Sequence, residues 1–145
     1  MSQEGIFAIK LRELESEYQQ TLSRLHLYQS EDHRKIKEEL EQAFAEYCDA
    51  ERRLQKSVNT SRSPAVAALS GAQLDYDRRV RRILQEELPG YYHARDDSPC
   101  ADQVEALSLY GEYAIDFAAQ AMRYAMMTVL SAIDAQMNLD EHRRK

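Results

Sequence analysis

The chain is poor in the residues that interrupt helices and in those that crosslink a fold. Its 145 residues include 4 glycines, 3 prolines, 2 cysteines and no tryptophan. Few glycines and prolines leave few turns, and much of the remaining sequence is Leu, Ala, Glu, Gln and Arg, which favour helices. Cys48 and Cys100 are too few for a disulfide framework, and the first residues lack the basic and apolar segments of a signal peptide. We therefore expect an all-α protein in the reducing cytoplasm.

The chain also lacks the motifs of the common helical-bundle enzymes and metal proteins. A di-iron site needs a Glu three residues before a His, but other residues precede the four histidines at that spacing: Ser23, Ser30, Gly90 and Leu139. Paired Cys-x-x-Cys or His-Glu-x-x-His zinc motifs, a phosphate-binding glycine loop and Gly-x-Ser-x-Gly are missing as well. The motifs therefore predict no cofactor, no catalytic residue and no metal ligand.

Positive charge is not in excess, since the formal net charge is −6. Such a chain repels nucleic acid unless it carries a local basic patch. The one basic cluster, Arg78–Arg82, has acids four residues away from three of its four arginines. This spacing predicts i,i+4 ion pairs, namely Asp75–Arg79, Asp77–Arg81 and Arg82–Glu86. Weak nucleic-acid binding through Arg78–Arg82 is therefore a minor alternative.

No apolar run is both long and free of charge. Residues 117–133 are about as long as the shortest membrane span, but Arg123 lies near their middle and Asp134 follows them. A charge at the bilayer centre costs roughly 3 kcal/mol on insertion scales. We therefore expect no membrane partner, and we interpret this segment as part of a helix inside a bundle.

Helix signals divide the chain into four expected helices within one domain, residues 1–145. Ser30, Ser63–Pro64 and Ser98–Pro99 are typical helix starts, and Leu88–Pro89–Gly90 is a typical stop. The expected helices cover about residues 5–28, 30–58, 64–88 and 98–139. For the first two, the alternative is one continuous helix from 5 to 58, with a one-residue skip in its apolar stripe.

The third expected helix has an internal glycine and an apolar face. Gly71 can bend the helix or split off a short first segment. Its apolar face consists of Val66, Leu69, Tyr76, Val80, Ile83 and Leu84.

The last expected helix is the most informative segment, because it is apolar around most of its circumference. Its charges fall within a stripe roughly 40° wide, formed by Glu105, Glu112, Asp116, Arg123 and Asp134. The remaining arc of roughly 260° is apolar or small, which is typical of a helix covered on nearly every side. We therefore predict an elongated four-helix bundle in which helix 98–139 is central.

Within this arc, small residues follow one another at steps of three and four. They form a seam on which another backbone can approach closely, and we predict it as an interface: Gly111, Ala114, Ala118, Ala121 and Ala125. Three shorter helices offer little apolar surface for so wide an arc, so we expect a coiled-coil-like contact with a second copy or with another helical protein. The leading hypothesis is therefore a protein that acts by association, most simply as a dimer.

The longest irregular stretch offers the main alternative. Residues 91–97 combine His93 with Asp96 and Asp97, and a histidine beside carboxylates can act as a base or bind a metal. The same residues also suit a connection between two helices, with the acids as caps. A small enzyme, or a metal- or nucleotide-binding protein, using this loop is the rival hypothesis.

Overall fold

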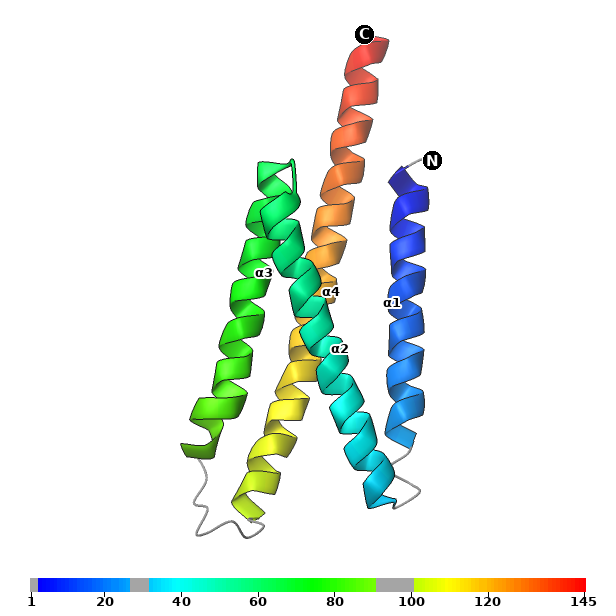
Figure 1. Cartoon of the computed structure of the whole chain (residues 1–145). Coiled ribbons are helices and arrows are strands. Elements are labelled where there is room, and N and C mark those ends of the chain that lie inside the picture. The colour runs from blue at the N-terminus through cyan, green and yellow to red at the C-terminus, as the bar shows by residue number, and fades with distance from the viewer. Residues whose placement is uncertain (1–2, 27–31, 91–100) are drawn as a thin grey trace. The chain divides into compact units, whose positions relative to one another are not determined.

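The computed structural model describes residues 3–26, 32–90 and 101–145. These residues form four α-helices and no strand: α1 (Gln3–Leu25), α2 (His33–Thr60), α3 (Pro64–Arg82) and α4 (Ala101–Arg144) (Figure 1). The predicted all-α class is confirmed. The complete bundle, with α4 at its centre, stays a prediction.

Helices α1 and α2 are separate helices. Helix α1 ends at Leu25, and Asp32 has an extended backbone with φ −86° and ψ 96°. The Asp32 side chain caps α2 by accepting a hydrogen bond from the backbone N–H of Lys35 at 3.3 Å. The cap is therefore Asp32 and not the expected Ser30, which lies outside the described residues. An aspartate suits this position because its charge also interacts favourably with the helix dipole.

A three-residue turn joins α2 to α3. Ser61 closes α2 with a backbone hydrogen bond to Ser57 O at 3.0 Å. Ser63 then caps α3 by accepting from the N–H of Val66 at 3.4 Å, and Pro64 opens the helix. The start predicted from Ser63–Pro64 is confirmed. Figure 1 shows the consequence, an antiparallel hairpin of α2 and α3.

Helix α3 changes geometry at its end. It continues through Gly71 without a break, and then passes into a π-helix, Ile83–Glu87, and a short 3-10 helix, Leu88–Gly90. The N–H of Leu88 bonds the carbonyl of Ile83, five residues back. Pro89 has no N–H to continue the ladder, so the stop predicted at Leu88–Pro89–Gly90 falls where this geometry ends.

By backbone proximity the chain divides into two units. One contains residues 1–21 and 104–145, and the other contains residues 22–103. In the first, α4 runs past the expected end at 139 to Arg144, and its last turn carries His142, Arg143 and Arg144. Basic residues there favour the helix dipole. The start expected at Ser98–Pro99 lies outside the described residues.

The buried apolar core of the second unit is small and differs from the one expected. Of the apolar residues in the described chain, Leu74 and Leu88 alone are buried, with 3% and 8% of their surface exposed. The face expected for α3 omitted Leu74 and is largely on the surface, since Val66, Leu69 and Tyr76 are exposed. The expected face is not the one that meets α2: Arg78 and Arg81 pair with Glu51, and a Cβ at Gly71 would lie 4.0 Å from Val58.

Candidate functional site

A buried glutamate lies in the apolar stripe of α2. This stripe runs through Tyr47, Leu54 and Val58 at three- and four-residue steps, and Glu51 occupies the position four residues after Tyr47. Only 8% of the surface of Glu51 is exposed. A carboxylate is rarely buried unless it is paired, so the packing of α2 against α3 must supply its partners.

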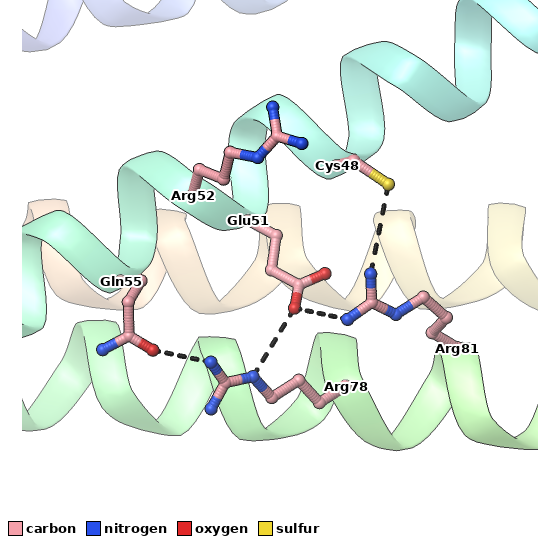
Figure 2. A pocket seen from close by; sticks show the side chains of 6 residues that line it. All are labelled: Cys48, Glu51, Arg52, Gln55, Arg78 and Arg81. Atoms are coloured by element: carbon pink, nitrogen blue, oxygen red, sulfur yellow. Dashed lines mark hydrogen bonds and ion pairs between the residues drawn. The ribbon is translucent and has the colours of Figure 1, made fainter.

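Two arginines of α3 provide these partners. The Nη2 of Arg81 donates to Glu51 Oε1 at 2.7 Å, and the Nε of Arg78 lies 3.5 Å from the same oxygen (Figure 2). Spacings of four and seven residues from Leu74 place both arginines on the side of α3 that carries Leu74. The hairpin is thus joined by an Arg–Glu–Arg triad beside its buried leucine.

The triad lines an open hollow of about 260 Å³ between the two helices. Its walls consist of Cys48, Glu51, Arg52, Gln55, Arg78 and Arg81. Figure 2 shows Arg78 and Arg81 pointing from α3 toward Glu51, while Gln55 and Cys48 lie on either side of it on α2. We call this group the hairpin cluster.

Each arginine of the hairpin cluster has further contacts. Arg78 Nη2 donates to Gln55 Oε1 at 2.6 Å, and Arg81 Nη1 lies 4.0 Å from Cys48 Sγ. At the rim, Arg52 Nη1 donates to Asp49 at 2.9 Å. Among the described residues, the second oxygen of Glu51, Oε2, is buried without a hydrogen-bond partner. The cluster therefore holds more N–H donors than acceptors, but places one acceptor where no donor reaches it.

Burial and charge also affect a neighbouring acid. Burial raises the pKa of Asp77, and the negative charge of Glu51 raises it further. The backbone carbonyl of Asp77 accepts a hydrogen bond from the hydroxyl of Tyr47 at 3.0 Å, which ties α2 to α3 again. The electrostatic effect of Glu51 thus extends beyond its own ion pairs.

The structure changes the expected pairing of the Arg78–Arg82 cluster. The sequence spacing predicted that Arg81 pairs with Asp77, but Arg81 reaches across to Glu51. Arg79 pairs with Glu87 at the end of the same segment. Local spacing could not show this, because Glu51 lies thirty residues from Arg81. These side chains serve intramolecular ion pairs, which weakens the nucleic-acid alternative.

A second ion-pair group joins the end of α1 to α2. Arg24 hydrogen-bonds the carboxylates of Glu39 and Glu46, the latter at 2.8 Å. The hydrogen bond from Arg24 lowers the pKa of Glu46, as does a second one from Gln42 at 3.1 Å. Arg24 therefore holds two positions of α2 that lie seven residues apart, on one face of that helix.

Helix α4 presents a different kind of surface. None of its described residues is buried, and all of residues 111–124 are exposed. The predicted interface residues lie on it: Gly111, Ala114, Ala118 and Ala121 are exposed, and Ala125 is half-buried. Beyond its chain neighbours and the backbone of its own helix, a Cβ added at Gly111 would meet no atom within 4 Å. Its large exposed apolar residues are Val104, Leu107, Leu109, Tyr113, Ile115, Phe117, Met122, Tyr124, Met126, Met127, Leu130, Met137 and Leu139.

Residues of α4 that are small from Gly111 to Ala135 repeat every seven positions. Two rows with this spacing lie side by side: one is Val104, Gly111, Ala118, Ala125 and Ala132, and the other is Leu107, Ala114, Ala121, Thr128 and Ala135. A strict seven-residue repeat keeps one face turned toward a partner helix along a left-handed pair. Small side chains let two backbones approach at the short end of the usual 8–10 Å range. We call these two rows the heptad face.

The rival loop site lies outside the described residues, because His93, Asp96 and Asp97 fall within 91–100. Within the three described segments, no group of three or more His, Cys, Asp or Glu side chains is placed to hold a metal ion. No helix in the described part of the chain has the length and apolar character of a membrane span.

Sequence reasoning missed the hairpin cluster, although one signal was present. Glu51 is the single acid inside an otherwise apolar stripe, and a polar residue at such a position often specifies register between paired helices. Its partners could not be identified from spacing, because they depend on which face of α3 turns toward α2. Comparison with known proteins adds no identification: no family model, no curated protein and no solved structure matches this chain.

Proposed function

We propose that this protein acts by association, and that the heptad face of α4 joins two copies of the chain. The carrying observation is the exposure of that face: α4 is 44 residues long, and none of its described residues is buried. A helix that is apolar over most of its circumference is usually covered. Uncovered apolar surface of this extent marks an interaction site.

The available area is sufficient for a stable pair. At 1.5 Å per residue, α4 is about 66 Å long. Because the heptad face consists mostly of small side chains, most of the area must come from large side chains beside it: Tyr113, Phe117 and Tyr124 are exposed, and an aromatic side chain buries about 150–250 Å². A standard interface needs only about 800 Å² from each partner.

A second copy is the partner that the repeat favours. In a two-fold pair, each residue meets a counterpart from the same face, so the face must complement itself. Two neighbouring rows of small residues do so, because neither carries a bulky or charged side chain between Gly111 and Ala135. The charged stripe lies on the other side of the helix, where it can remain in water. Another helical protein is the alternative occupant, and the cytoplasm is the proposed location.

The test is a charge inserted into the heptad face. The double variant Ala118→Glu/Ala121→Glu places two carboxylates against the partner, and burying unpaired charge is strongly unfavourable. We expect the dimer dissociation constant to rise at least ~100-fold, measured by sedimentation equilibrium.

The matched control is Arg123→Glu, which changes the net charge by the same amount. Arg123 lies roughly 140° or more around the helix from Ala118 and Ala121, and it donates a hydrogen bond to Gln120 within α4. This variant should keep the dimer. Equal dissociation by both variants would mean that charge alone, and not the heptad face, governs association.

The other hypotheses have less support. Catalysis or metal binding through His93, Asp96 and Asp97 stays a proposal without an observation in its favour. Nucleic-acid binding through Arg78–Arg82 is disfavoured by the pairs that Arg78 and Arg81 form with Glu51.

A further inference from the structure

The hairpin cluster is a feature that association through α4 does not use. It contains three guanidinium groups and one carboxylate around one open hollow. Arg52 is neutralised at the rim by Asp49, so the two inner arginines share the single charge of Glu51. Asp77 interacts electrostatically with Glu51 but does not line the hollow, so the inner wall itself carries two positive charges and one negative charge.

The arginines also have donors to spare. A guanidinium has about five N–H donors in a planar fork that matches the oxygens of carboxylates and phosphates. Arg81 uses Nη2 for Glu51 and only a long contact to Cys48 for Nη1. Arg78 uses Nη2 for Gln55 and Nε for a 3.5 Å approach to Glu51. The side chains of Arg78 and Arg81 are still 48% and 33% exposed.

The size of the hollow suits a small anion. This open hollow has a volume of about 260 Å³, and a water molecule in the liquid occupies about 30 Å³. A tetrahedral or planar oxyanion fits together with several waters. On either side of Glu51, Gln55 provides a polar amide and Cys48 a thiol with a weak S–H donor.

We propose that the hollow of the hairpin cluster binds a small oxyanion, a phosphate or a carboxylate, through the free N–H groups of Arg78 and Arg81. Glu51 has two effects in this site. It fixes both guanidiniums in place, and its negative charge weakens their attraction for an anion. We therefore expect that removing the charge of Glu51 strengthens anion binding and that removing an arginine weakens it.

The experiment follows the side-chain Nε–H resonances of the arginines by NMR while sodium phosphate is added to the full chain. Sodium chloride is reduced in step, so that the ionic strength stays constant. A parallel titration with sodium acetate distinguishes a phosphate-selective site from one for any carboxylate. We expect saturable shifts of the Arg78 and Arg81 resonances with at least one of the two anions.

Three variants should change the dissociation constant of the anion in different ways. Arg78→Gln should weaken binding about tenfold or more, because a charge-assisted hydrogen bond is lost. Glu51→Gln should tighten binding severalfold, since it removes a negative charge from the site. Arg53→Gln is the control, because Arg53 is exposed on α2 and does not line the hollow; it should leave the dissociation constant unchanged.

Each outcome supports or overturns the proposal. If Arg78→Gln lowers the helix content, Arg78→Lys takes its place: it keeps the charge but loses the planar fork, and should still weaken binding. Non-saturable shifts, or equal weakening by Arg53→Gln and Arg78→Gln, would mean that the anions only screen surface charge. Weaker binding in Glu51→Gln would contradict the assigned role of Glu51.

Discussion

The α2–α3 hairpin and helix α4 differ in how much of their side-chain surface is buried and in how many contacts they make to another helix. In the hairpin, Leu74 is 3% exposed, and a buried acid is bonded by two arginines of the other helix. In α4, no described residue is buried. Its side-chain hydrogen bonds stay within the helix: Ser108, Thr128 and Ser131 donate to backbone carbonyls, and Arg123 donates to the side chain of Gln120.

This difference is the reason for proposing that α4 needs a partner, whereas the α2–α3 hairpin makes specific contacts of its own. Polar and charged contacts give the hairpin a defined pairing even though its apolar core is small. Helix α4 has the opposite composition, with abundant exposed apolar surface. Since isolated helices depend on packing for most of their stability, α4 is the element for which association should matter most.

The largest expected effect on stability comes from replacing a leucine by alanine in the hairpin, compared with the same replacement in α4. Leu74→Ala removes the most buried side chain of the hairpin, and we expect a loss of about 2–4 kcal/mol in the free energy of unfolding. Leu107 lies on the heptad face and is 47% exposed, so Leu107→Ala should cost about 1 kcal/mol or less in a separate chain. Urea unfolding at two protein concentrations separates these cases.

The protein concentration distinguishes the effects of Leu107→Ala and Leu74→Ala. If α4 joins two copies, the penalty of Leu107→Ala grows with protein concentration, because the dimer buries Leu107. The penalty of Leu74→Ala should persist at the lowest concentration, because the hairpin buries Leu74 within one chain. Equal, concentration-independent losses for both variants would show that Leu107 is covered by its own chain.

A smaller effect is expected from the Arg–Glu–Arg triad. Glu51→Met leaves Arg78 and Arg81 without their shared acceptor, and we expect a loss of roughly 1–3 kcal/mol, below the value for fully buried pairs because both arginines are partly exposed. The triple variant Glu51→Met/Arg78→Met/Arg81→Leu removes all three charges and should recover most of that loss.

Glu51→Met should also change the pKa of Asp77. Because Glu51 contributes to the raised pKa of Asp77, Glu51→Met should move the pKa of Asp77 toward its ordinary value, as measured by NMR titration of its carboxyl carbon. An unchanged pKa of Asp77, together with a triple variant less stable than the single one, would contradict the assigned electrostatics.

The smallest expected effect is the pH dependence of the Arg24 ion pairs. The pKa of Glu46 is lowered from 4.5 by Arg24 and then by Gln42, so the folded state holds the ionised form more strongly than the unfolded state. The stabilisation is fully present above pH 4.5 and is lost as the pH falls through the lowered pKa.

This dependence is measured by thermal unfolding between pH 5 and 3, a range of about two units chosen around the ordinary pKa of a glutamate. Glu46→Gln should flatten the curve in this range, and Glu41→Gln, an exposed glutamate on the same helix, should not. A curve that both variants flatten equally would assign the effect to the overall charge of α2.

Local signals in the sequence predicted the helices, but not the contacts between them. The Ser63–Pro64 start and the Leu88–Pro89–Gly90 stop were readable because capping and the missing N–H of proline are local effects. The buried face of α3 was not, since Leu74, Arg78 and Arg81 lie outside its most apolar stripe.

The pairing of Arg81 with Glu51 shows the same limit at the candidate site. An acid four residues away favours a local ion pair, but packing of α3 against α2 brings a more buried acid within 2.7 Å. The heptad face, by contrast, was visible as a seam of small residues, because its periodicity belongs to one helix. What the seam contacts depends on a partner, which a single sequence does not specify.

The most direct test of self-association is the mass of the protein in solution, measured by light scattering over a dilution series. We expect twice the chain mass of 16.8 kDa at high concentration, and a shift toward the monomer in Ala118→Glu/Ala121→Glu but not in Arg123→Glu. A mass that stays at 16.8 kDa throughout the wild-type series would contradict self-association through α4.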